Sequence, residues 1–111
     1  MFTINRIAVV VEPKGPYYAW ARQLDEDGPS IDDKGPKDRC SVYLIEWAEA
    51  AEAILRRHFG RIFEEKLNAW HRVADDWPQK RTYKMFRDWF HIRLVDLVLD
   101  LEDDPIVQDE F

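Results

Sequence analysis

The chain has 111 residues, of which 46% are hydrophobic and 34% are charged, a composition that suits one packed domain and leaves no room for a second. Its formal net charge of −6 disfavours nucleic-acid binding, because a basic surface is what attracts the phosphate backbone. The single cysteine, Cys40, excludes an internal disulfide, and the sequence shows neither the pattern of a signal peptide nor that of a membrane span. We therefore expect a cytoplasmic protein with no nucleic-acid or membrane partner.

The first predicted element is a strand from Thr3 to Val11. Its centre is the unbroken apolar run 7–11, which is typical of a strand covered on both faces. Pro13 and Pro16 end the strand, and Pro16 suits the first position of a helix. Four apolar residues at helical spacing then predict a short helix: Tyr17, Trp20, Ala21 and Leu24.

Residues 25–39 are a predicted loop, because they carry two Gly-Pro pairs and no apolar periodicity. Compact domains rarely keep a loop of this length without a reason. We favour a plain surface loop, and a functional cleft beneath residues 25–39 is the alternative.

A second strand is predicted from Cys40 to Ile45, with Cys40 expected as a small buried side chain. The strongest pattern of the chain follows in residues 48–70, where apolar side chains recur at i, i+3, i+4 and i+7 and charged side chains fill the other positions. At about 1.5 Å rise per residue this amphipathic helix is roughly 34 Å long, so it predicts the centre of the core. Its apolar positions are Ala48, Ala51, Ile54, Leu55, Phe59, Ile62, Phe63, Leu67 and Trp70.

A further helix is predicted after residue 82. Pro78 biases Trp77 away from helical geometry and ends the preceding helical stretch. Thr82 suits the N-cap of the next helix. The expected buried side chains of that helix are Met85, Phe86, Trp89 and Phe90.

Residues 91–101 predict the last strand, because their pattern alternates with a period of two. A helix is the alternative for so leucine-rich a run. Asp96 and Asp100 are expected near solvent, and the acidic tail, 102–111, is expected to fray. The expected core face of the strand consists of Arg93, Val95, Leu97, Leu99 and Leu101.

The predicted order is β-α-β-α-α-β within a single domain, residues 1–101. This order indicates the α+β class, with a small mixed three-stranded sheet on which the helix 48–70 packs. A β-α-β start favours two parallel strands joined by a right-handed crossover. The two helices that follow would then return the third strand antiparallel.

Short motifs are spread over most of the chain. They are Arg6-x-Ala8, Pro13-Lys14-x-Pro16-Tyr17-x-x-Trp20, Val42-Tyr43-Leu44-Ile45, Trp77-Pro78-x-x-Arg81-Thr82-x-x-x-Phe86-x-x-Trp89-Phe90 and Asp100-Leu101. Together they resemble a family of short uncharacterised bacterial proteins, a domain of unknown function. The resemblance implies a shared fold and carries over no catalytic residue.

The sequence contains no pattern that predicts catalysis, a cofactor or a metal. His58, His71 and His91 lack the spacing of metal ligands. The serines, Ser30 and Ser41, have no histidine close in sequence, and the four glycines form no phosphate-binding loop. We therefore predict no catalytic, cofactor-binding or metal-binding residue.

Aromatic residues at the ends of the predicted elements are the strongest functional hint. Exposed Trp and Tyr, together with Arg, anchor many protein interfaces, although capping of the core edges is the structural alternative. The predicted partner contacts are Tyr17, Tyr18, Trp47, Trp77 and Arg81.

The leading hypothesis is therefore a non-catalytic protein-interaction or assembly module that binds a partner protein or forms a homodimer. One alternative is a small enzyme or ligand-binding domain with a cleft under residues 25–39. Another is an acidic surface that mimics nucleic acid.

Overall fold

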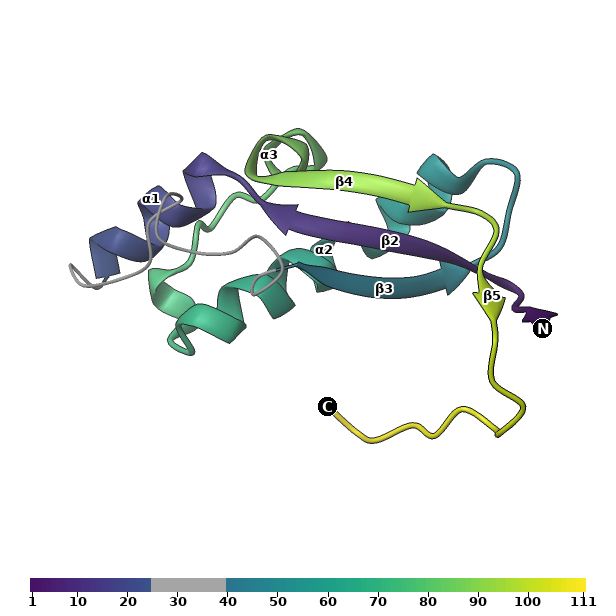
Figure 1. Cartoon of the computed structure of the whole chain (residues 1–111). Coiled ribbons are helices and arrows are strands. Elements are labelled where there is room, and N and C mark those ends of the chain that lie inside the picture. Colours follow the sequence, from purple (N-terminus) through teal and green to yellow (C-terminus); the bar gives the residue numbers. More distant parts are fainter. Residues whose placement is uncertain (25–39) are drawn as a thin grey trace.

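A three-stranded antiparallel sheet forms the centre of the computed structural model, which describes residues 1–24 and 40–111 (Figure 1). The middle strand is β2, Arg6–Pro13, and it is flanked by β3, Ser41–Glu46, and by β4, Phe90–Val95. The described helices are α1, Gly15–Leu24; α2, Ala51–Trp70; the short 3₁₀ helix η2, Ala74–Asp76; and α3, Tyr83–Trp89. The predicted α+β class is confirmed.

Two further strands form a small ribbon at one end of the sheet. β1, Phe2–Thr3, pairs antiparallel with β5, Leu99–Asp100. Arg6 follows β1 closely and pairs with Glu46 at the end of β3. The ribbon therefore lies at the Glu46 end of β3, and the chain continues from there to Phe111.

The direction of β3 differs from the prediction. Ile7 pairs with Ile45 and Val11 with Ser41, so β2 and β3 are antiparallel, and the predicted parallel pair was wrong. A parallel crossover needs a helix that runs back along the sheet. Instead, α1 continues beyond the end of β2 (Figure 1), and the chain enters β3 at the end where it left β2.

α2 confirms the predicted amphipathic helix over all but its first turn. Leu55, Phe63 and Leu67 on its apolar face are fully buried against the sheet. The helix begins at Ala51, three residues later than predicted, because the backbone of Ala50 is non-helical, with φ −90° and ψ 63°. Within the described parts of the chain, no helix combines the length and the apolar character needed to cross a lipid bilayer.

An aromatic cluster joins the helices to the sheet. The Phe63 ring lies 5.4 Å from that of Phe90 and 5.5 Å from that of Trp89, measured between ring centroids. Tyr17 belongs to the same cluster, and its hydroxyl donates a hydrogen bond of 2.8 Å to the Lys66 carbonyl. Such ring pairs contribute about 0.5–1.5 kcal/mol each beyond the area they bury.

α3 begins where the sequence predicts. The side chain of Thr82 accepts a hydrogen bond of 3.1 Å from the backbone N–H of Met85, which is the geometry of an N-cap. Phe86 is fully buried in the core, and Met85 and Trp89 pack against it in part. The predicted cap and buried stripe are confirmed.

The last predicted strand is shorter than expected and presents its other face to the core. β4 ends at Val95, and its core side chains are Phe90, Ile92 and Leu94, whereas Arg93 is exposed. Phe90 enters the core directly from α3, and this position sets the phase of the alternating side chains that follow. The core face predicted for this strand was therefore wrong. Val95 is only partly buried, and the remaining members of that set are exposed: Leu97, Leu99 and Leu101.

Candidate functional site

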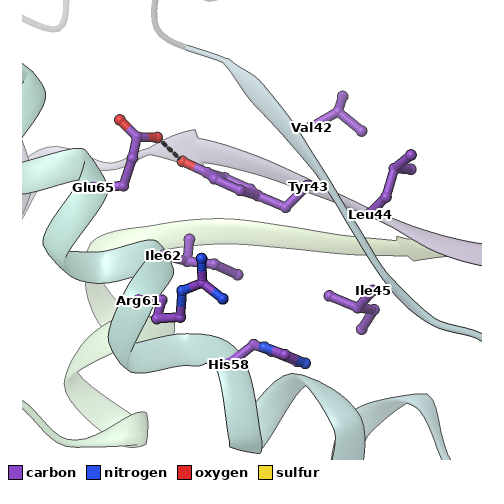
Figure 2. Close-up of a pocket in the computed structure, with 8 residues that line it drawn as sticks. All are labelled: Val42, Tyr43, Leu44, Ile45, His58, Arg61, Ile62 and Glu65. Atoms are coloured by element: carbon purple, nitrogen blue, oxygen red, sulfur yellow. Dashed lines mark hydrogen bonds between the residues drawn. The ribbon is translucent and has the colours of Figure 1, made fainter. Parts of the chain in front are cut away.

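A groove separates β3 from α2, and we call it the β3–α2 groove (Figure 2). Its volume is about 390 Å³, within the range of sites that bind small ligands or single side chains. The helix contributes positions with i, i+3, i+4, i+7 spacing, which is one face, and the strand contributes four consecutive residues. The lining residues are Val42, Tyr43, Leu44, Ile45, His58, Arg61, Ile62 and Glu65.

One side of β3 is open for backbone pairing. In the described ranges β3 pairs with β2 alone, and it stands at the edge of the order β3-β2-β4. An edge strand presents unpaired N–H and C=O groups, which form a template for another extended chain. The β3–α2 groove therefore lies beside a free strand edge.

The floor of the groove is apolar and its inner wall is held by a hydrogen bond. Ile45 and Ile62 are buried below the opening. The Tyr43 hydroxyl on the strand donates a hydrogen bond to the Glu65 carboxylate on the helix (Figure 2). Burial, and then the hydrogen bond and negative charge of Glu65, raise the pKa of Tyr43 well above its ordinary value. The phenol therefore stays protonated and keeps this contact at neutral pH.

Basic side chains line the rest of the α2 wall of the groove. Arg61 and His58 both reach from α2 toward β3 (Figure 2). Neither forms an ion pair or a hydrogen bond with the side chains of residues 1–24 and 40–111. Arg57, the neighbour of His58, differs because it pairs with Glu46 at 3.0 Å. The groove thus offers an uncommitted guanidinium and imidazole to a ligand.

A second cavity, which we call the Ser41 cavity, continues the groove along the same strand and helix. It also measures about 390 Å³ and shares Glu65 with the first. The buried Lys66 ammonium donates a hydrogen bond to the Ser41 hydroxyl and so fixes the start of β3 on α2. The lining residues are Pro13, Tyr17, Ser41, Glu65, Lys66, Ala69, Trp70 and Phe111.

Two of the predicted partner contacts lie in the core. Tyr17 and Tyr18 are only 3% and 2% exposed. Both point inward from α1 because Tyr17 joins the aromatic cluster and its hydroxyl bonds to α2. Their rings are not available on the surface, in contrast to the expectation for residues at an element boundary.

The other predicted contacts lie at opposite ends of α2. Trp77 and Arg81 come together near its C-terminal end, with the guanidinium 5.9 Å from the Trp77 ring centroid. Arg81 is also committed to Glu64, at 2.9 Å. Trp47 is 48% exposed near the other end, where its indole N–H donates to the Asp96 carbonyl. The five residues therefore do not form one site.

Sequence reasoning missed Arg61 and His58. Arg61 occupies the charged side of the predicted helix, where a solvated position is the ordinary expectation, and His58 lies at the edge of its apolar stripe, where a partly buried, hydrogen-bonded histidine is expected. Their regular spacing with Ile62 and Glu65 is visible in the sequence. The free edge of β3 beside them depends on the strand order, which the sequence does not reveal.

The described residues hold no cluster of three or more His, Cys, Asp and Glu side chains that could bind a metal. Cys40 is partly exposed, not buried as expected. Ser41 is paired with Lys66. The hypothetical cleft beneath residues 25–39 lies outside the described residues.

No protein-family model, no curated protein and no solved structure matches this chain. The resemblance to short bacterial proteins therefore stays a prediction from the motifs. The geometry of the β3–α2 groove is the basis for a functional proposal.

Proposed function

We propose that this protein is a non-catalytic interaction module that binds an extended segment of a partner protein along β3. The carrying observation is that a free strand edge and an apolar groove lie side by side. In strand addition, the backbone of the incoming segment pairs with the edge, and alternate side chains enter the neighbouring groove. β3 and the β3–α2 groove supply both parts.

The side chains of the groove define which segments fit. Ile45 and Ile62 favour an apolar side chain, and Arg61 and His58 favour a carboxylate. The net charge of −6 opposes an acidic segment at long range, so this preference depends on direct contact with Arg61. The preferred partner is an extended segment in which the side chains on one face, at every second position, are apolar and acidic in turn.

The proposed setting is the bacterial cytoplasm, with a protein partner and no nucleic acid. The lone cysteine supports a reducing compartment, and the motif resemblance supports the bacterial origin. A second copy of the chain is also a protein partner of this kind, and self-association would use the same strand edge.

Selection from a phage-displayed library of random heptapeptides tests the proposal. We expect the full chain to enrich peptides in which every second residue is in turn apolar and acidic. Arg61→Glu should abolish binding of the enriched peptides, since it replaces the cation with a repelling charge. Arg93→Glu is the matched control, because Arg93 is exposed on β4 and lies on the other face of the sheet.

Backbone pairing is tested separately with the enriched peptides. N-methylation at alternate positions removes the N–H groups that would pair with β3 and should abolish binding. The proposal is wrong if no peptide is enriched, if Arg61→Glu binds the peptides as wild type does, or if N-methylated peptides bind equally well.

A further inference from the structure

The C-terminal segment, residues 101–111, has the properties of a ligand for the β3–α2 groove. Every one of its residues is exposed. It carries exposed apolar side chains at Ile106, Val107 and Phe111, with carboxylates at Asp109 and Glu110 between them. At every second position, which is one face of an extended chain, the segment presents Val107, Asp109 and Phe111, and so an acidic side chain between two apolar ones.

The segment also starts and ends in the right places. It leaves β5 at the Glu46 end of β3. Figure 1 shows it running below β3, against the direction of that strand, and Phe111 borders the Ser41 cavity at the other end. At about 3.3 Å per residue, the part after Pro105 is roughly 20 Å long, which is also the length of the six-residue β3.

We propose that residues 106–111 close onto β3 of the same chain as a fourth, antiparallel strand, and so occupy the β3–α2 groove from within. The inference rests on the proposed function and names the regulation of that site. Pro105 supplies the corner, since it has no backbone N–H. Residues 106–111 contain no proline, and each can donate to a strand ladder.

The register follows from the position of Phe111 beside Ser41. With these two residues opposed in an antiparallel pair, Asp109 lies opposite Tyr43, and Val107 opposite Ile45. Directly opposed residues share a face of the sheet, so Phe111, Asp109 and Val107 all face α2.

Each of these three side chains then meets a matching surface. Val107 lies over Ile45 and Ile62, the apolar floor of the groove. Asp109 faces the uncommitted guanidinium of Arg61. Phe111 enters the Ser41 cavity, and the intervening Gln108 and Glu110 point to the opposite face of the sheet.

Closure within one chain makes the segment an internal competitor. A tethered segment that can span its site acts at an effective concentration of about millimolar. An external segment must displace it, so the apparent affinity for that segment is the intrinsic affinity multiplied by the fraction of chains that are open. Sequestration or modification of residues 106–111 would therefore activate the groove.

Amide hydrogen exchange of the full-length protein tests this closure. In wild type, the β3 amides that do not bond to β2 should be protected. We expect Asp109→Arg or Arg61→Glu to accelerate their exchange at least about fivefold, because each places like charges together. Arg61→Glu combined with Asp109→Arg should restore protection, since the pair is re-formed with its charges exchanged.

The matched control is Glu110→Arg, which makes the same charge change one residue further on, on the opposite face, and should leave the β3 amides protected. Protection that is unchanged in Asp109→Arg, or not restored in the double variant, would overturn the inference. A loss of protection on tenfold dilution would also overturn it, because it would show exchange of segments between two chains. If library peptides still bind β3 in those cases, the proposed function stands alone.

Discussion

The hydroxyl of Tyr43 on β3 donates a hydrogen bond to the carboxylate of Glu65 on α2. This contact crosses the inner end of the β3–α2 groove, where the groove meets the Ser41 cavity. It links the edge strand to the helix, and among residues 1–24 and 40–111 the outer side of the strand stays unpaired. The same contact makes the groove sensitive to alkaline pH.

Tyr43→Phe should destabilise the protein at neutral pH and matter less at alkaline pH. Burial and Glu65 raise the pKa of Tyr43 above its ordinary value of 10.0, so the folded state holds the phenol proton more tightly than the unfolded chain. That stabilisation is complete below about pH 10 and is lost as the pH rises further. Urea unfolding at about pH 8 should show a loss near 1 kcal/mol for the variant, and at about pH 11 the difference should shrink. Parallel curves for the two proteins would contradict this assignment.

Thr82→Ala should lower the free energy of unfolding by about 1 kcal/mol, because it removes the acceptor for the backbone N–H of Met85. Thr82→Ser keeps the hydroxyl and serves as the control. Chemical denaturation of the two variants beside wild type measures the difference. An equal loss in both variants would assign the effect to the methyl group and not to the cap.

Phe63→Ala should cost about 3–5 kcal/mol, because its ring is fully buried among Phe86, Trp89 and Phe90 and its removal leaves a cavity. Phe2→Ala is the matched control, since Phe2 is exposed in β1, and it should stay within about 0.5 kcal/mol of wild type. Thermal unfolding followed by tryptophan fluorescence reports both. If Phe63→Ala fails to fold, Phe63→Leu should give a smaller loss of the same sign.

Asp109→Arg should increase the affinity of the full chain for library-selected peptides about two- to tenfold, because it releases the internal competitor. Glu110→Arg should leave that affinity unchanged. Fluorescence anisotropy with one labelled peptide compares the three proteins. A gain in both variants would instead indicate a general electrostatic effect of the acidic segment.

The sequence predicted the elements that are governed by local rules. The helix of residues 51–70 follows from its 3.6-residue period, and the start of α3 follows from the hydroxyl of Thr82. Residues 91–101 show the limit of such rules, since their two alternating faces are almost equally apolar. Phe90 decides between these faces, and its burial depends on α3 and not on the strand itself.

The candidate site was less predictable than the fold. The aromatic residues Tyr17 and Tyr18 were expected at a surface, but they are buried because α1 packs on α2 and α3. Arg61 and His58 are candidate ligand contacts because the edge of β3 beside them is open. β3 stands at the edge because β4 pairs with the other side of β2 and not with β3. The pairing of β2 with β4 joins residues that are far apart in the chain.

The placement of β2 at the centre of the sheet affects how the protein is made. β2, which ends at Pro13, is synthesised well before one of its partners, β4, which begins only at Phe90. At ordinary elongation rates, the run Ile7–Val11 waits on the order of 5–15 s for that partner. A β-branched run without charges is prone to aggregation while it is unpaired. The nascent chain should therefore benefit from a chaperone that covers β2 until β4 emerges.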